Sequence, residues 1–311
     1  MKDYEQLTLI EKVAWQETSV FARVSPKQKL DLISVLQEGK NIVGMTGDGV
    51  NDAPALKKAD IGIAMGLRGT QVSQEVADMV LKDDSFTSIV TAIKQGRRIF
   101  DNIRKFVIFL LSCNLSELMV IATASVLNLH FQLFPLQILF INLITDVLPA
   151  LALGVTEASA DIMRRPPRNI NESIIDKKRW KTIFFYSIVI AVMSIGAVFT
   201  SHYTLHRSEP LNPELCNNIL FFTLIFCQLL HVLNMGSVSS FFRSEVFRNQ
   251  YVWWAITFSS LILFGMYAIE PTREVLSLYE MSVYDWLIAV SASIVSLIII
   301  QAGKKMKWVT Q

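Results

Sequence analysis

The amino-acid sequence predicts an α/β domain followed by an all-α bundle of six transmembrane helices. Of the 311 residues, 52% are apolar and only 18% are charged, whereas about a quarter of the residues of a soluble domain are charged. Residues 1–105 contain Gly, Pro, Asp and Lys in ordinary proportions, and long charge-free stretches begin only after Phe106. We therefore expect a soluble domain over residues 1–105 and a membrane domain over residues 106–311.

The composition also excludes several classes of protein. The net charge is only +2, and a nucleic-acid-binding protein would carry a basic excess, so no nucleic-acid partner is expected. The hydrophobic content is too high for a disordered chain. Cys113, Cys216 and Cys227 are the only cysteines and all lie in apolar runs. A secreted domain held together by disulfides is therefore excluded as well.

The soluble part contains three short strand-like runs separated by helical stretches. The runs are Asn41–Thr46, Ile61–Met65 and Asp78–Lys82. Short strands that alternate with helices are typical of a parallel sheet with crossover helices. Ligands bind such sheets at the carboxyl ends of the strands, so the loop after the first run is the expected position of the chemistry.

That loop carries two carboxylates, Asp48 and Asp52, between glycines that let the backbone approach a ligand closely. A hard cation such as Mg²⁺ binds a few carboxylates together with phosphate oxygens. The alternative is an ordinary loop in which an Asp caps the following helix and a Gly makes the turn. The spacing alone fits both interpretations.

The membrane part contains six apolar stretches, each about as long as the roughly 20 residues that cross a bilayer as a helix. Basic residues gather in the loop after the second stretch, in the loop after the fourth, and at Lys304 and Lys305 near the C-terminus. Positive charge marks the cytoplasmic side, so both termini and the soluble part are expected in the cytoplasm. The expected spans are Phe106–Asn128, Phe134–Val155, Thr182–Ser201, Leu215–Met235, Asn249–Ile269 and Trp286–Gly303.

Polar residues recur at helical spacing in the first two spans. Asn114 and Glu117 lie three residues apart in one, and Asn142, Thr145 and Asp146 fall within one turn of the other. Residues three and four apart share a helix face, so both sets can face one site. Each carboxylate at mid-membrane costs about 2.5–3.5 kcal/mol, which a bound cation offsets. Oxygen-only ligands suit hard cations such as Ca²⁺.

Pro149, just after this set, removes a backbone hydrogen bond and predicts a broken helix of the kind that marks transport sites. The alternative is that the polar groups join helices by hydrogen bonds. That suits Asn114 and Thr145. It suits Glu117 and Asp146 poorly, because neither span offers a Lys or Arg at that depth.

Three segments carry a resemblance to one family. Thr46-Gly-Asp-Gly-Val-Asn-Asp-Ala-Pro-Ala-Leu56 resembles the hinge motif of the P-type cation-transporting ATPases. Upstream, Ala22-Arg-Val-Ser-Pro-Lys-Gln-Lys29 is similar to a segment of that family's phosphorylation domain. Downstream, Asn142-Leu-Ile-Thr-Asp-Val-Leu-Pro-Ala150 is similar to the ion-binding helix of the calcium-pump subclass. The resemblance implies a partial haloacid-dehalogenase-like, Rossmann-like phosphorylation domain over 1–105 and a cation-transport domain over 106–311.

The resemblance also implies roles for single residues. Asp48 would hold the Mg²⁺ that accompanies phosphoryl transfer from ATP, and ATP itself would bind mainly to domains outside this sequence. Asn51 and Asp52 would organise the phosphorylation site, and Lys29 would contact the phosphoryl group, which fits a reaction driven by positioning and electrostatics. The alternative for Lys29 is a solvated helix lysine.

In the membrane, the resemblance places Asn114, Glu117, Asn142, Thr145 and Asp146 at ion-ligand positions. Gln228 stands where the subclass often carries a Glu, so a second Ca²⁺ site would be weakened. Gln228 and the nearby His231 fit interhelical hydrogen bonding as well as ligation. Ca²⁺ is the expected transported cation, and Mn²⁺ stays open.

The family's nucleophile belongs to an Asp-Lys-Thr-Gly-Thr motif, which the 311 residues do not contain. We therefore expect no phosphoenzyme from this chain alone, and expect it to work with N-terminal pump domains, in cis or as a separate chain. The predicted function is the C-terminal part of an ATP-driven Ca²⁺ pump in the cell membrane. Two alternatives are a truncated or non-catalytic membrane subunit that binds cations or partners, and a membrane-anchored phosphatase.

Overall fold

The computed structural model describes residues 7–169, 172–206, 210, 212–237, 241–306 and 308–309. The chain forms two compact units, Met1–Lys94 and Gln95–Gln311. The division falls within helix α5 (Phe86–Val126), on the N-terminal side of the boundary expected after residue 105. Each unit is described separately below.

The first unit is built on a three-stranded parallel sheet with the strand order β1-β2-β3. This confirms the predicted sheet, although β1 and β3 are shorter than the apolar runs that predicted them. Gly62 allows the sheet to pack closely against the segment that contains Leu56, because a Cβ at Gly62 would lie 2.5 Å from the carbonyl oxygen of Leu56. The strands are β1 (Gly44–Gly47), β2 (Ile61–Met65) and β3 (Met79–Leu81).

The helices of this unit begin where the sequence supplies caps. The side chains of Thr8 and Ser25 accept hydrogen bonds from the third backbone amide of their helices and complete capping boxes. Pro26 occupies the first turn of the second helix, where its missing N–H costs nothing. The elements are α1 (Leu9–Glu17), α2 (Pro26–Glu38), the 3₁₀ turn η2 (Val50–Asp52), α3 (Ala53–Lys58) and α4 (Gln71–Val76). The assignment of this unit to the haloacid-dehalogenase-like class stays a prediction.

The second unit is a helical bundle. Six helices of the described residues are long and apolar enough to cross a membrane, in agreement with the number and order of the predicted spans. They are α5, α6 (Pro135–Gly154), α7 (Lys177–Leu205), α8 (Pro213–His231), α9 (Gln250–Ala268) and α11 (Val283–Lys305). The shorter pieces are η3 (Val232–Met235), which extends α8, η4 (Phe241–Arg243) and α10 (Glu270–Val275).

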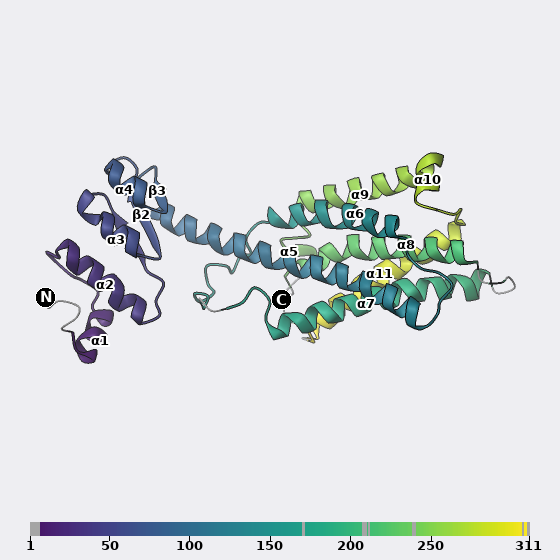
Figure 1. Cartoon of the computed structure of the whole chain (residues 1–311), viewed down its shortest axis with the longest axis horizontal. Coiled ribbons are helices and arrows are strands. Elements are labelled where there is room, and N and C mark those ends of the chain that lie inside the picture. Colours follow the sequence, from purple (N-terminus) through teal and green to yellow (C-terminus); the bar gives the residue numbers. More distant parts are fainter. Residues whose placement is uncertain are drawn as a thin grey trace. The chain divides into compact units, whose positions relative to one another are not determined.

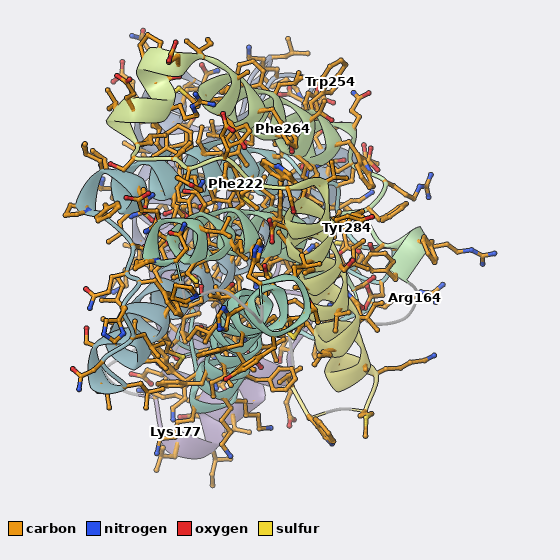
Figure 2. All side chains as sticks on the ribbon, turned by 90° about the vertical axis from the view of Figure 1, so that its right-hand side faces the viewer. Arg164, Lys177, Phe222, Trp254, Phe264 and Tyr284 are labelled. Atoms are coloured by element: carbon orange, nitrogen blue, oxygen red, sulfur yellow. The ribbon has the colours of Figure 1, made fainter. Side chains whose placement is uncertain are left out.

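Helix α8 is the centre of the bundle. It lies between the α7–α11 pair and the α6–α9 pair (Figure 1). Phe222 on α8 is fully buried and packs its ring 4.5 Å from that of Trp286 on α11. Trp254 and Tyr284, in contrast, project from the outer helices (Figure 2) and are 69% and 65% exposed. Exposed apolar side chains on the outside of such a bundle are those expected to face lipid.

One prediction about the membrane part is wrong in detail. Helix α6 is not broken, because it continues through Pro149 to Gly154. The proline still leaves the carbonyl of Thr145 without its intrahelical donor. Lys304, one of the basic residues near the C-terminus, is only 2% exposed. Its ammonium donates to the carbonyl oxygens of Asn234 (2.6 Å) and Gly236 (2.7 Å), and so satisfies carbonyls at the end of η3.

Candidate functional site

The membrane site is centred on the carboxylate of Glu117, which is 4% exposed. Gln228 Nε2, from α8, donates to Glu117 Oε1 at 3.0 Å. With its amide nitrogen turned toward Glu117, Asn142 of α6 lies 3.2 Å from both carboxylate oxygens and donates to them. Three helices, α5, α6 and the more distant α8, therefore meet at one carboxylate.

The second carboxylate, Asp146, lies beside the first. Thr145 Oγ1 is 3.4 Å from Asp146 Oδ1, and the Asn114 side chain also interacts with Asp146. The charges of Asp146 and Glu117 are close enough to interact electrostatically. The structure thus brings all six predicted ion-site residues together: Asn114, Glu117, Asn142, Thr145, Asp146 and Gln228.

These carboxylates have no cationic partner in the part of the chain that the structure describes. Within the described ranges, neither Glu117 nor Asp146 forms an ion pair with a Lys, Arg or His. The same ranges contain no group of three or more His, Cys, Asp or Glu placed to hold a metal. Any cation bound here would therefore be held by two carboxylates together with amide, hydroxyl and carbonyl oxygens. That donor set suits a hard cation.

Two partners of Gln228 were not predicted. Its Nε2 lies 3.3 Å from the carbonyl oxygen of Cys113 and 3.4 Å from Ser116 Oγ. The Oε1 atom of Gln228 is buried and has no hydrogen-bond partner among the described residues. Ser116 stands next to Glu117, but the hydroxyl of a serine in a helix ordinarily bonds to its own backbone. The sequence therefore provided no reason to expect that Ser116, rather than another helix serine, would contact Gln228.

His231 lies in a different environment from Gln228. Its ring stacks on Phe109 at 5.9 Å and meets Tyr186 edge-on at 4.9 Å. Nδ1 is 3.3 Å from the side-chain nitrogen of Asn234. These contacts favour a packing and hydrogen-bonding role for His231 over ligation.

The first unit holds the other predicted residues at the carboxyl end of β1. Lys29 Nζ, from α2, is 2.5 Å from Asp52 Oδ1, and the Gly49 backbone N–H donates to Asp52 Oδ2 at 3.4 Å. Gly47 is required here, because a Cβ would lie 2.6 Å from that of Asp52. Burial acts to raise the pKa of Asp52, but the hydrogen bond and charge of Lys29 outweigh it and hold this pKa below its ordinary value.

Asp48 and Asn51 lie on the same loop but are not joined to the Lys29–Asp52 pair by their side chains. Both are exposed. The backbone carbonyl of Asp48 accepts from Thr70 N at 2.8 Å, which ties the loop to the start of α4. The carboxylate of Asp48 and the amide of Asn51 make no side-chain hydrogen bond within the part of the chain described. An exposed carboxylate beside a Lys–Asp pair is an arrangement that can accept Mg²⁺ and a phosphoryl group.

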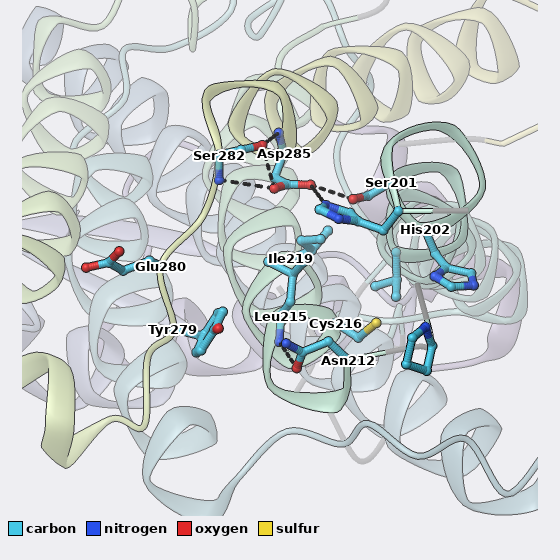
Figure 3. A pocket seen from close by; sticks show the side chains of 13 residues that line it. Ser201, His202, Asn212, Leu215, Cys216, Ile219, Tyr279, Glu280, Ser282 and Asp285 are labelled. Atoms are coloured by element: carbon cyan, nitrogen blue, oxygen red, sulfur yellow. Dashed lines mark hydrogen bonds and ion pairs between the residues drawn. The ribbon is translucent and has the colours of Figure 1, made fainter. Parts of the chain in front are cut away.

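A third polar cluster was not predicted. A cavity of about 250 Å³ lies at the ends of α7, α8 and α11 (Figure 3). Asp285, 1% exposed, accepts from Ser201 Oγ at 2.5 Å and from Ser282 Oγ at 2.7 Å, and His206 Nε2 lies 3.5 Å from it. Since Ser282 and Asp285 form the capping box of α11, this carboxylate has a structural role as a helix cap.

Comparison with known proteins gives one consistent result. Residues 130–306 match the family described as "Cation transporting ATPase, C-terminus". The chain is 40% identical over 278 residues to a calcium-transporting ATPase of Bacillus subtilis, covering 89% of this chain and 31% of that protein. It is 38% identical over 302 residues to calcium-transporting ATPase 1 of Bacillus cereus, covering 93% and 34%.

A eukaryotic relative gives the same result. The chain is 38% identical over 274 residues to the rat calcium-transporting ATPase type 2C member 2, covering 88% of this chain and 29% of that protein. The chain thus spans about a third of the length of the curated relatives it matches. The family match covers more than half of the chain and includes α6 to α11. The chain therefore belongs to the P-type cation-transporting ATPases, as a C-terminal region of the calcium-pump type.

Proposed function

We propose that this chain forms the ion-translocating part of an ATP-driven Ca²⁺ pump and the end of its phosphorylation domain. The observation that carries the proposal is the pair of membrane carboxylates, Glu117 and Asp146, surrounded by oxygen donors and without a cationic partner among the described residues. Two such carboxylates cost about 5–7 kcal/mol in a bilayer. A divalent cation bound between them offsets that cost.

Each side chain has a definite part in this proposal. Glu117 and Asp146 supply the charge, and Thr145 and Asn114 supply neutral oxygens beside Asp146. Gln228 and Asn142 hold the Glu117 carboxylate through their amide nitrogens until a cation displaces them. Because Gln228 is neutral, the site carries two negative charges, which matches one divalent cation. The relatives named as calcium-transporting support Ca²⁺ as that cation.

In the first unit, Asp48 would hold Mg²⁺, which neutralises charge on a phosphoryl group when it is bound. Lys29 would contact the phosphoryl oxygens, and its pairing with Asp52 fixes where its ammonium points. Asn51 and Asp52 would shape the loop around that site. ATP and the phosphorylated Asp would come from pump domains outside this sequence, in cis or as a separate chain. The same proposal puts the protein in the cell membrane with both termini in the cytoplasm.

The experiment is the substitution Asp146→Asn in a complete pump that contains this chain. We expect cation-dependent phosphorylation by ATP to be abolished, because the site loses half of its charge. Glu270→Gln, which removes an exposed carboxylate from α10, is the control and should leave phosphorylation unchanged. Normal cation dependence of the Asp146→Asn pump would contradict the assignment.

A second candidate is a membrane subunit that binds cations without hydrolysing ATP, and the missing Asp-Lys-Thr-Gly-Thr motif is compatible with both candidates. The two differ in one observation. A pump requires the phosphorylated domain in the same assembly, so isolation of the native assembly from membranes and radioactive labelling with ATP separates them.

A further inference from the structure

An apolar groove of about 740 Å³ runs along the bundle between α6 and α9. Leu148, Leu151 and Ala152 line it from α6, and Trp254 and Phe258 line it from α9. Leu151 and Trp254 are 66% and 69% exposed, so the groove is open on its outer side. An exposed apolar groove of this kind takes an elongated apolar group.

A polar cavity of about 1070 Å³ adjoins the groove. The two spaces share three lining residues, Arg98, Val155 and Tyr251, and are therefore neighbours. The apolar space and the polar space together form one amphipathic site. Tyr251 and Trp254 lie at the start of α9, next to this junction, as aromatic residues do at a membrane interface.

The polar cavity contains arginines that have no carboxylate partner among the described residues. Two of its acidic residues are paired, Asp161 with Arg165 (3.1 Å) and Glu245 with Lys105 (2.6 Å). Glu157 is the remaining acid in the cavity lining. Arg243 and Arg248 also line the cavity. Both are exposed, and neither forms an ion pair with a carboxylate of the described residues.

Arg98 adds a third positive charge, and its position is fixed. Its Nε donates to the carbonyl oxygen of Thr156 and its Nη2 to that of Val155, both at 2.8 Å. The guanidinium is thus held at the junction between the polar and apolar spaces. An ammonium or guanidinium at this depth is the partner expected for a headgroup phosphate.

We infer that this composite site binds one phospholipid with an anionic headgroup, with an acyl chain in the α6–α9 groove and the phosphate near Arg98, Arg243 and Arg248. A free phosphate would use only the polar half, and an uncharged lipid only the apolar half. The groove runs beside the same helix that carries Asn142, Thr145 and Asp146. A lipid bound in the groove would contact both α6 and α9 and stabilise their packing. The inference does not depend on the proposed transport activity.

The test is native mass spectrometry of the full chain released from detergent micelles that contain either phosphatidylglycerol or phosphatidylcholine. We expect one phosphatidylglycerol to remain bound, at least tenfold more than phosphatidylcholine. The double variant Arg243→Gln/Arg248→Gln should lose this preference. Arg243→Lys/Arg248→Lys should keep most of it, because the charge is retained.

Two further variants separate the lipid from other ligands. Leu151→Trp fills the groove from an exposed position and should reduce retention of the lipid at least fivefold. Arg164→Gln removes an exposed arginine outside the cavity lining and should change nothing. Equal retention of the two lipids, an unchanged preference in the Gln double variant, or displacement of the lipid by millimolar inorganic phosphate would each overturn the inference.

Discussion

At the residue scale, Gln228 distinguishes the proposed ion site from one with three carboxylates. Its amide donates to Glu117 in a fully buried position. In Gln228→Glu, a third carboxylate would replace that donor. Without cation we expect the free energy of unfolding to fall by about 1–3 kcal/mol, because a buried hydrogen bond is lost and charge is added. Added Ca²⁺ should restore it.

The measurement is thermal unfolding of the chain in lipid nanodiscs, in a chelator and in Ca²⁺. Gln301→Glu, on α11 and bonded to Asn234, is the matched control and should show no recovery specific to Ca²⁺. If Gln228→Glu is destabilised to the same extent with and without Ca²⁺, Gln228 does not face the cation.

The Lys29–Asp52 pair predicts an acid-sensitive loop in the first unit. The pKa of Asp52 lies below its ordinary value of 3.8, since the Lys29 hydrogen bond and charge outweigh burial. A lowered carboxyl pKa contributes stability that is present above the ordinary value and is lost as the pH falls through the folded value. We expect about 0.5–1 kcal/mol, because Lys29 is partly exposed and screened.

Lys29→Met removes the stabilising partner and leaves the burial of Asp52, so its carboxyl should take up a proton at a higher pH. Hydrogen exchange of residues 44–58 in the full chain, measured from pH 7 to pH 3, should show loss of protection beginning earlier in the variant. Lys27→Met is a control on the same helix. Identical acid profiles for the wild type and Lys29→Met would refute this account of the pair.

The two membrane carboxylates could be predicted as candidate ligands because an unpaired charge in an apolar helix is costly and is therefore usually functional. The partners of Glu117 were only partly predictable. Asn142 lies on the neighbouring span, but the contact between Glu117 and Gln228 joins residues 111 positions apart and depends on how α8 packs in the bundle. Sequence spacing describes one helix face at a time, so it gives candidate ligands and not their contacts.

At the element scale, an ion pair and a cation–π contact hold the loop after α6 against α5. Arg165 Nη1 donates to Asp101 Oδ2 at 2.8 Å, and Arg168 lies over the Phe100 ring at 3.8 Å. Arg165→Glu would replace the Arg165–Asp101 ion pair with two like charges. In a complete pump we expect ATP-driven transport to fall several-fold while the protein still folds, since exposed ion pairs add little stability.

The adjacent Arg164→Glu is the control, because Arg164 is exposed and makes no side-chain ion pair with a described residue. Transport by reconstituted vesicles and the melting temperature are measured for both variants. Equal transport by Arg165→Glu and Arg164→Glu would show that the loop contact does not contribute to transport.

Strong local patterns predicted the elements well. Apolar runs that alternate with helical stretches predicted the three parallel strands, and long apolar stretches predicted the six helices of membrane length. The structural details that the sequence analysis did not predict depend on tertiary contacts. Helix α6 accommodates Pro149 without ending, and Lys304 is buried because carbonyls of a different helix are there to accept its protons. Neither is visible in local sequence.

At the scale of the whole molecule, our proposal assigns ion binding and phosphorylation to different parts of the pump. The chain holds the carboxylate pair but has no Asp-Lys-Thr-Gly-Thr motif. Reconstituted alone in vesicles with radioactive ATP and Ca²⁺, it should form no acid-stable phosphoenzyme. Labelling should appear when the remaining pump domains are supplied. Labelling of the chain alone would show that a different residue of this sequence accepts the phosphoryl group.

The central claim is that Glu117 and Asp146 together bind the transported cation. Equilibrium binding of radioactive Ca²⁺ to a complete pump containing this chain, without ATP, tests it most directly. We predict saturable binding in the wild type, loss of at least 100-fold in affinity for Asp146→Asn, and unchanged binding for Glu270→Gln. If Asp146→Asn binds the same amount of Ca²⁺ with the same affinity, the cation is bound elsewhere and the proposed site is wrong.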